Sequence, residues 1–322
     1  MKKLNGVIIA AAGVAALLVS DTAFAQAIGI GTGPQASLTN RIGSAIAKVV
    51  ADGAGLNTRA IPHTANSAHA PLVERGTLAF GVSSSGDIAD AVAGTGSFKG
   101  HPISGKWMVA SRMASLPVGT LVRKDSPFRK LSDMKGKKFA CGFTAQKTVL
   151  NILNAFIANA GMKISDLNCV NVPNTTGGTA QFLKGNVDGT PSSLGGARLR
   201  NAAAKVGGIR ILKMDNSPAG IAAMQKHYPG SYLTKLRAKG IGVEGETWSM
   251  AFDMNLMTSS STPNDVVYKA VKAIHGGKKG LIKVWGGFRG FKQAKMAVLA
   301  SGVKIHPGAM KFYNEVGIKP GK

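Results

Sequence analysis

Short runs of β-favouring residues alternate with stretches of helical periodicity along most of the chain. Four strands are predicted in its first part, at residues 28–31, 57–62, 78–82 and 107–113. Apolar residues at helical spacing from Ile42 to Val50 predict a helix after the first strand, with Thr39 or Asn40 as its N-cap. Strands that alternate with helices in this way are typical of an α/β fold with a largely parallel sheet.

The segment from 131 to 214 repeats the same alternation within itself. Short strands are predicted in the runs KKFACG, NCVNV, VDGTP and IRILKM, and an apolar stripe over residues 149–160 predicts a helix. The chain then returns through ETWSMAFDMNLMTS, whose alternating apolar residues predict a long strand. Thr262 and Pro263 have the side chains preferred at the start of a further helix.

One α/β unit inserted between two halves of another predicts two lobes, joined by two crossing segments that act as a hinge. Residues 26–117 and 246–322 form lobe 1, and residues 118–245 form the inserted lobe 2. Ligands of such sheets lie outside the carboxyl ends of the strands. We therefore expect a cleft between the lobes and hinge closure about a bound ligand.

The N-terminal residues have the pattern of an export signal. Lys2 and Lys3 precede an apolar run too short to span a bilayer, and Ala23 and Ala25 form an A-x-A cleavage site before Gln26. Residues 1–25 are therefore predicted to be a cleavable secretory signal peptide, which places the mature protein in the periplasm. No later stretch reaches the roughly 20 apolar residues of a membrane helix, so we expect a soluble protein that is not itself membrane-embedded.

The charge balance points to anionic partners. The 322 residues include 40 Lys and Arg against 15 Asp and Glu, a formal charge of +25 that raises the local concentration of anions. The basic residues are scattered singly and in pairs, and aromatic residues make up only 6% of the chain. Because no basic arm or stacking platform stands out, nucleic acid is not an expected partner.

The stretch GIGTGP after the first predicted strand resembles a phosphate-binding turn but lacks the full G-x-G-x-x-G pattern, and no acidic residue follows the second strand. A glycine-rich turn before a helix still offers backbone N–H groups to a carboxylate, although it could also be a tight turn without a ligand. Three further strand-to-helix junctions, HTANSAH, SSSGD and FTAQKT, carry hydroxyl and amide side chains. Together the four junctions would surround one cleft with hydrogen-bond donors.

Signals of catalysis, metal binding or a cofactor are weak. The six histidines lack the H-E-x-x-H or other zinc spacings, and no G-x-S-x-G nucleophile elbow occurs. We therefore expect no enzyme activity, no metal and no cofactor. Cys141 and Cys169 lie in predicted strands: they could form a disulfide if those strands are neighbours, but we favour two buried thiols.

Several longer motifs resemble a known family over nearly the whole mature length. They are IGIGTGP with IGSAIAKVV, LVERGTLAFGV, VGTLVRKDSPFRKLSDMKGKKFACG, NVDGTPSSLGG, PNDVVYKAVKAI and, most specifically, KIHPGAMKFYNEVG. The chain resembles the solute-binding subunits of TAXI-type tripartite ATP-independent periplasmic (TRAP) transporters. The resemblance implies a two-lobed, type II-like periplasmic binding protein. Such proteins capture a small organic anion or amino acid and deliver it to membrane subunits driven by an ion gradient.

The resemblance also implies a set of ligand contacts. They are Thr32, Gly33, Asn66, Ser67, Ser84, Ser85, Thr144, Gln146, Lys147, Thr148, Ser192 and Ser193. Most would donate hydrogen bonds to the carboxylate of a dicarboxylate, keto acid or amino acid, and Lys147 would add positive charge. The chain departs from the family after GTGP, where aromatic residues are replaced by polar ones and Arg41 becomes available, either as a bidentate carboxylate partner or as a solvent-facing residue. These departures put a glutamate-like ligand in doubt.

Three other functions fit the same residues. An orphan binding protein would present its solute to a sensor instead of a transporter. A periplasmic enzyme would turn the bound compound over. A cationic surface protein would bind polyanions through its net charge, with an affinity that falls steeply with salt.

Overall fold

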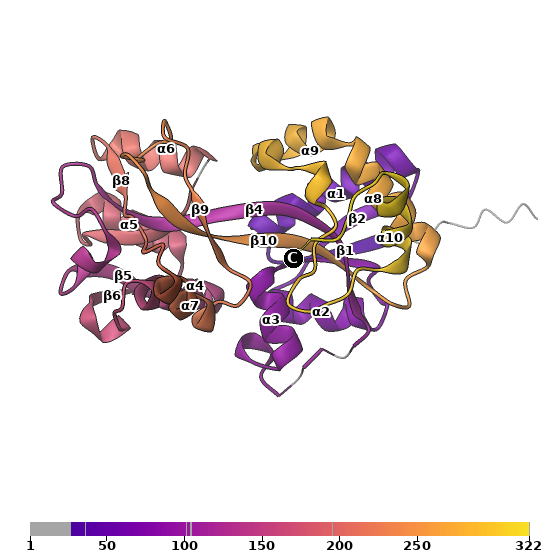
Figure 1. Cartoon of the computed structure of the whole chain (residues 1–322), viewed down its shortest axis with the longest axis horizontal. Coiled ribbons are helices and arrows are strands. Elements are labelled where there is room, and N and C mark those ends of the chain that lie inside the picture. Colours follow the sequence, from indigo (N-terminus) through magenta and orange to yellow (C-terminus); the bar gives the residue numbers. More distant parts are fainter. Residues whose placement is uncertain (1–26, 36, 101, 104, 195, 322) are drawn as a thin grey trace, which may run out of the picture.

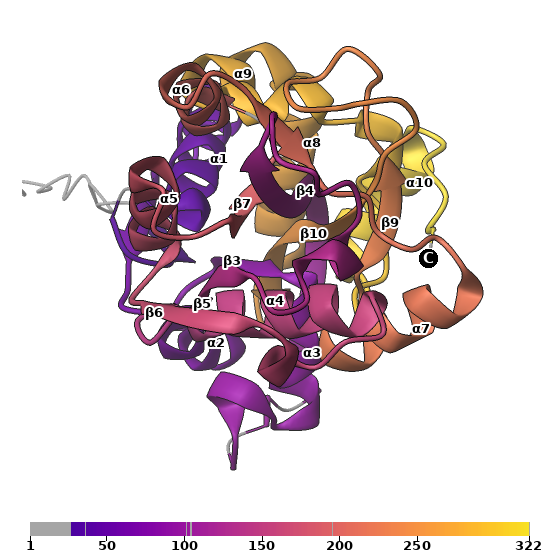
Figure 2. The same cartoon turned by 90° about the vertical axis from the view of Figure 1, so that its left-hand side faces the viewer.

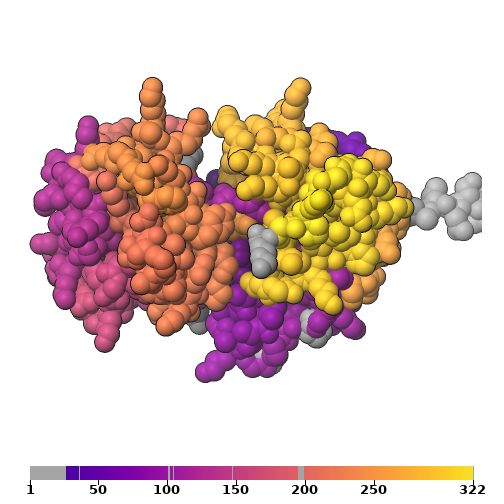
Figure 3. All heavy atoms as spheres, in the orientation of Figure 1, coloured from indigo at the N-terminus to yellow at the C-terminus, as the bar shows by residue number. Residues whose placement is uncertain are grey.

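The computed structural model describes residues 27–321 apart from 36, 101, 104 and 195, so the predicted signal peptide lies outside the described part. The fold is mixed α/β with two lobes, as predicted, and the second lobe is inserted into the first (Figure 1). Figure 3 shows the lobes as two masses that meet along a seam in the middle of the molecule. None of the described helices is long and apolar enough to cross a membrane.

The strands form one sheet that runs through both lobes, in the order β2-β1-β3-β10-β4-β7-β5-β6, with β8 beside β4 and β9 beside β10. Their bounds are Ile28–Thr32 (β1), Thr58–Pro62 (β2), Phe80–Ser84 (β3), Trp107–Arg123 (β4), Lys138–Gly142 (β5), Asn168–Val172 (β6), Gly189–Ser193 (β7), Ile209–Ile211 (β8), Tyr232–Lys235 (β9) and Trp248–Ser259 (β10). Six short strands pair in parallel, β1 with β2 and β3 in one lobe and β5 with β6 and β7 in the other, whereas β8 and β9 pair antiparallel with β4 and β10.

The two long strands β4 and β10 make the crossings between the lobes (Figure 1). They pair antiparallel over most of their length. A salt bridge also joins their side chains, with the Arg112 Nε 2.6 Å from the Asp253 Oδ2. The prediction ended the strand at Met113, whereas β4 continues to Arg123. The predicted lobe boundary at 117 falls inside β4, and the exact boundaries stay a prediction.

The helices cover the sheet within each lobe. Their bounds are Leu38–Ala54 (α1), Asn66–Glu74 (α2), Ser85–Ala93 (α3), Lys147–Asn159 (α4), Thr175–Lys184 (α5), Gly196–Lys205 (α6), Pro218–His227 (α7), Asn264–Gly276 (α8), Lys278–Val284 (α9) and Pro307–Glu315 (α10). The predicted N-cap of α1 was wrong: the Asn40 N–H donates to the Ser37 Oγ, so Ser37 caps the helix two to three residues earlier.

Glycines of β1 and β3 have a packing role. His69 of α2 is fully buried against β1 and β3, and a Cβ added to Gly31 or Gly81 would approach its side chain within 2.8 to 2.9 Å. A Cβ on Gly29 would likewise meet Leu78 and Ile61. The glycines therefore let α2 lie close to the sheet, which sets the position of the first residues of that helix.

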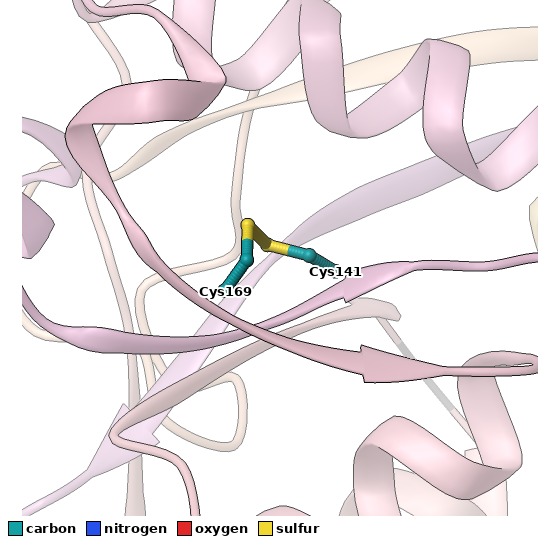
Figure 4. Close-up of a disulfide and its surroundings, with 2 residues drawn as sticks. All are labelled: Cys141 and Cys169. Atoms are coloured by element: carbon teal, nitrogen blue, oxygen red, sulfur yellow. A yellow bond between two sulfur atoms is a disulfide. The ribbon is translucent and has the colours of Figure 1, made fainter.

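Cys141 and Cys169 form a disulfide between the neighbouring parallel strands β5 and β6, with a Cα–Cα distance of 5.3 Å (Figure 4). The favoured expectation of two buried thiols was wrong. Cys141 is buried, but Cys169 lies on β6, an edge strand with mostly exposed residues. The disulfide therefore adds a covalent link to the parallel pairing that joins this edge strand to β5.

Candidate functional site

Three helices begin at the contact between the lobes, and their first turns converge on the carboxylate of Asp87. Asp87 lies in the first turn of α3 and is only 8% exposed. The Ser84 Oγ donates to its Oδ2 at 2.7 Å, and the Asn66 Nδ2, from the first residue of α2, donates to the same oxygen. From the inserted lobe, the Thr148 Oγ1 at the start of α4 donates to Oδ1 at 3.4 Å. This hydrogen bond joins the two lobes.

The single hydroxyl proton of Ser84 fixes the direction of these hydrogen bonds. Ser84 donates that proton to Asp87 and accepts the backbone N–H of Asp87 at 3.1 Å, as the N-cap of α3. The Tyr228 hydroxyl, 3.0 Å from the Ser84 Oγ, must then act as a donor. The direct neighbours of Asp87 are therefore all donors, which is the arrangement that suits an ionised carboxylate.

Tyr228 reaches this network from the inserted lobe. It directly follows α7, which packs on α4, yet its ring lies on Gly86 of α3, where an added Cβ would overlap the ring. The ring also packs against Phe252 of β10 at a centroid distance of 5.0 Å. Tyr228 thus closes the site on the side of the crossing strands.

The electrostatics of Asp87 are unusual for a chain so rich in lysine and arginine. Burial raises the pKa of its carboxyl, while the hydrogen bonds from Ser84 and Asn66 oppose that rise. Among the described side chains, no lysine, arginine or histidine forms an ion pair with it. A second anion about 4 Å away would be repelled by roughly 4 kcal/mol at an effective dielectric constant of 20, and a cation would be attracted by a similar amount.

The structure brings only some of the predicted contacts to this point. Asn66, Ser84 and Thr148 meet at Asp87, whereas the Ser85 hydroxyl bonds the backbone of Asp253. No described hydrogen bond of the Ser67 side chain connects it to this network.

The first loop after β1 uses most of its donors internally. Thr32 is fully buried and its hydroxyl donates to the Gly33 carbonyl oxygen at 3.0 Å, while the Gly33 N–H donates to the Thr39 Oγ1 at 2.9 Å. Gly33 nevertheless lies beside Asn66, because its added Cβ would come within 3.9 Å of the Asn66 Oδ1. The loop therefore forms a wall of the site, and ligand contacts from Thr32 and Gly33 stay predictions.

The remaining predicted residues of lobe 2 form no described hydrogen bond to Asp87. Gln146 accepts hydrogen bonds from Thr175, and Thr144 is exposed. Ser192 and Ser193 end β7 next to β4, and the Ser192 hydroxyl donates to a neighbouring carbonyl oxygen. The side chain of Lys147 lies outside the described part of the structure.

Two pockets are lined by residues of both lobes. One, of about 390 Å³, lies between Gly96 and Ser97 after α3 and residues of the β5–α4 turn that include Thr144. The other, of about 470 Å³, lies between Arg41 on α1 and residues of α5 and α6 that include Lys205. Figure 2 shows α1, α5 and α6 together at the upper left and α3 and α4 lower down, so the pockets open at separate places along the lobe contact. Arg41 is exposed and faces the inserted lobe rather than open solvent alone.

Within the described residues, no group of three or more His, Cys, Asp or Glu side chains is placed to hold a metal ion. Among the described residues, the side chains that bond Asp87 carry hydroxyls and an amide, and the second interlobe pocket adds the cationic Arg41 and Lys205. Their chemistry suits the binding of a small polar molecule by hydrogen bonds and charge.

Two α/β lobes joined by two long strands, with polar contacts across their boundary, define the fold of the periplasmic solute-binding proteins. The model of the NMT1-like family matches residues 30–317, so the chain belongs to that family.

Two solved structures with TM-scores above 0.5 share the fold. MatC from Rhodopseudomonas palustris with bound malate has a TM-score of 0.53 at 13% identity over 90% of this chain and 96% of its own. A structure described as a periplasmic transporter has a TM-score of 0.53 at 14% identity over 90% and 92%. The aliphatic sulphonate binding protein SsuA from Escherichia coli has a TM-score of 0.48 at 17% identity over 81% and 79%.

Sequence reasoning missed Asp87 and Tyr228. Asp87 was visible in SSSGD, three residues after Ser84, but this spacing also marks an ordinary helix cap. Tyr228 carried no signal, because it lies 144 residues from the serine that it contacts.

Proposed function

We propose that this chain is a periplasmic solute-binding protein that closes its two lobes on one small molecule and delivers it to the membrane subunits of a TRAP transporter. The hydrogen bond between Thr148 and Asp87 carries the proposal, because it joins the start of a helix in one lobe to the start of a helix in the other. A solute held at this point would contact both lobes and favour their closed arrangement.

The fold and the family support binding rather than catalysis. Structures of the same fold include one with bound malate, and the polar groups at the lobe contact are of the kind that orient a small solute. The predicted signal peptide supports a periplasmic location, and the sequence motifs support the TAXI type and TRAP delivery. The solute classes first expected are dicarboxylates, keto acids and amino acids.

Native mass spectrometry of gently purified protein tests the binding function directly. We expect one small molecule per chain, released unchanged on unfolding. A thermal-shift panel of the three solute classes provides a second test, since a ligand at 100 times its dissociation constant stabilises a protein by about 2.7 kcal/mol. Recovery of a chemically altered compound would indicate an enzyme instead.

Arg41→Ala separates the two interpretations of that arginine. If Arg41 closes on the solute across the larger pocket, the variant should lose the thermal shift, whereas Arg59→Ala, a change at an exposed residue of β2, should keep it. Loss of uptake of the solute in a deletion strain would support the transporter role, and normal uptake would favour a sensor.

A further inference from the structure

We propose that Asp87 is the specificity-determining residue of the interlobe site and that the solute carries a protonated nitrogen, an ammonium or guanidinium group, that binds this carboxylate. The inference rests on the proposed function and deepens it, since it names the charge of the group that lies at the centre of the lobe contact.

The first observation is that the expected anion-binding donors are already occupied. Asn66, Ser84 and Thr148, each predicted to hold a solute carboxylate, all donate to the carboxylate of Asp87. The positive ends of three helices also point to this group, because Asn66, Asp87 and Thr148 lie in the first turns of α2, α3 and α4. The protein's own carboxylate thus fills the place that a solute anion would take.

The second observation is that the two carboxylate oxygens differ. Oδ2 accepts hydrogen bonds from both Ser84 and Asn66 of lobe 1, whereas Oδ1 accepts only a long one, of 3.4 Å, from Thr148 of lobe 2. A carboxylate offers about four acceptor positions in all. The unfilled capacity therefore lies on Oδ1, the oxygen that faces the inserted lobe, where a solute would enter between the lobes.

The third observation is the charge. Asp87 is 8% exposed, and no described basic side chain is paired with it. A buried charge without an opposite charge is unfavourable. A solute ammonium or guanidinium would supply both the missing charge and N–H donors for Oδ1, whereas a solute carboxylate would add a second negative charge. Closure therefore favours the cationic group.

Matched pairs of solutes test this inference on the unaltered protein. The pairs are glutamate with 2-oxoglutarate, aspartate with malate, and 4-aminobutyrate with butyrate, each measured by calorimetry and thermal shift beside the solute found by native mass spectrometry. We expect the nitrogen-bearing member of any pair that binds to bind about 100-fold more tightly, which corresponds to about 2.8 kcal/mol at 1.4 kcal/mol per factor of ten. The solute found with the purified protein should also carry a protonated nitrogen.

Other outcomes distinguish this inference from the proposed function. Equal or tighter binding of the member without nitrogen, or a co-purified solute that lacks a protonated nitrogen, would overturn the role of Asp87 while the binding function stands. Absence of any bound solute in every measurement would overturn the binding function and the inference with it.

Two variants test whether the preference for the nitrogen-bearing solute arises from Asp87. Asp87→Asn keeps the shape of the side chain but removes its charge, so the preference for the nitrogen-bearing member should fall to less than about threefold. Asp52→Asn removes an exposed charge on α1 that is paired only with Lys48 among the described residues, and should keep the full preference. An unchanged preference in a folded Asp87→Asn protein would contradict the inference, and the matched pairs on the unaltered protein decide it if that variant does not fold.

Discussion

The two lobes contribute to the candidate site in different ways. Lobe 1 supplies Ser84 from the end of the buried strand β3 and Asp87 from the first turn of α3. Both are less than a tenth exposed and are bonded to each other. Lobe 2 supplies Thr144 and Gln146 from an exposed turn and Thr148 from a half-buried position. The lobe 1 residues of the site are therefore held by their own hydrogen bonds, whereas lobe 2 adds one long hydrogen bond, from Thr148.

The lobes also differ in what stabilises them. Lobe 1 encloses two buried histidines, His69 and His306, within its apolar packing. Lobe 2 holds its exposed edge strand β6 by the disulfide between Cys141 and Cys169. The two lobes should therefore lose stability under different conditions, lobe 2 under reduction and lobe 1 under acid.

Reduction of the disulfide should have the largest effect. The bond closes a loop with a sequence separation of 28, for which the chain-entropy model gives roughly 3.5 kcal/mol. In hydrogen–deuterium exchange, dithiothreitol should increase exchange in β5 and β6 and leave β1 to β3 protected. The paired variant Cys141→Ala with Cys169→Ala should behave like the reduced protein and show no further response to dithiothreitol. Equal loss of protection in both lobes would contradict their independent stabilisation.

Acid should act on the opposite lobe. Burial, with a smaller effect from His63, lowers the pKa of His69 from 6.5 to about 4, and burial also lowers the pKa of His306. Below pH 6.5 the unfolded chain takes up a proton at position 69 that the folded protein rejects. The stability contributed by neutral His69 is thus complete above pH 6.5 and is lost as the pH falls toward 4, by about 3 kcal/mol at 1.36 kcal/mol per pKa unit.

Denaturant unfolding between pH 7 and 4 measures this loss. His69→Gln should show a shallower fall in the free energy of unfolding, whereas His227→Gln, at an exposed residue of lobe 2, should follow the unaltered protein. The rise in the pKa of Asp87 works in the opposite direction, because neutralising a buried carboxylate favours the folded state as the pH falls. Asp87→Asn should therefore make the acid loss steeper.

The sequence predicted the parts of the fold that follow from local patterns and missed those that depend on which elements are neighbours. Periodicity located β1 to β3, β5, β6 and β10, and the insertion of one α/β unit into another gave the two lobes. The length of β4 was missed because Pro117 reads as a break, although this residue pairs with Ala251 of β10 within the long strand. The disulfide depended on which strands are neighbours, and this information is absent from spacing alone.

The sequence predicted which segments form the candidate site, but not that a carboxylate of the protein lies at its centre. The junctions after the strands did reach the lobe contact, as shown by Asn66, Ser84 and Thr148. Sequence alone could not show that all three donate to Asp87, because their hydrogen bonds depend on where three helices start relative to one another. An acid three residues after a serine looks the same in any helix cap.

Single hydroxyl deletions should give the smallest effects. They test whether the lobe 1 residues of the site are held in place by their own hydrogen bonds. Ser84→Ala removes the cap of α3 and a donor to a buried carboxylate, and should lower the free energy of unfolding by about 2 kcal/mol. Ser217→Ala, the matched cap of α7 in lobe 2, should lower it by about 1 kcal/mol, because the acid beside it, Asp215, is exposed. Thr148→Val should change it by less than about 0.5 kcal/mol, since its hydroxyl bonds Asp87 only across the lobes. A cost for Thr148→Val equal to that for Ser84→Ala would mean that the closed contact is part of the folded core and that the lobes do not part.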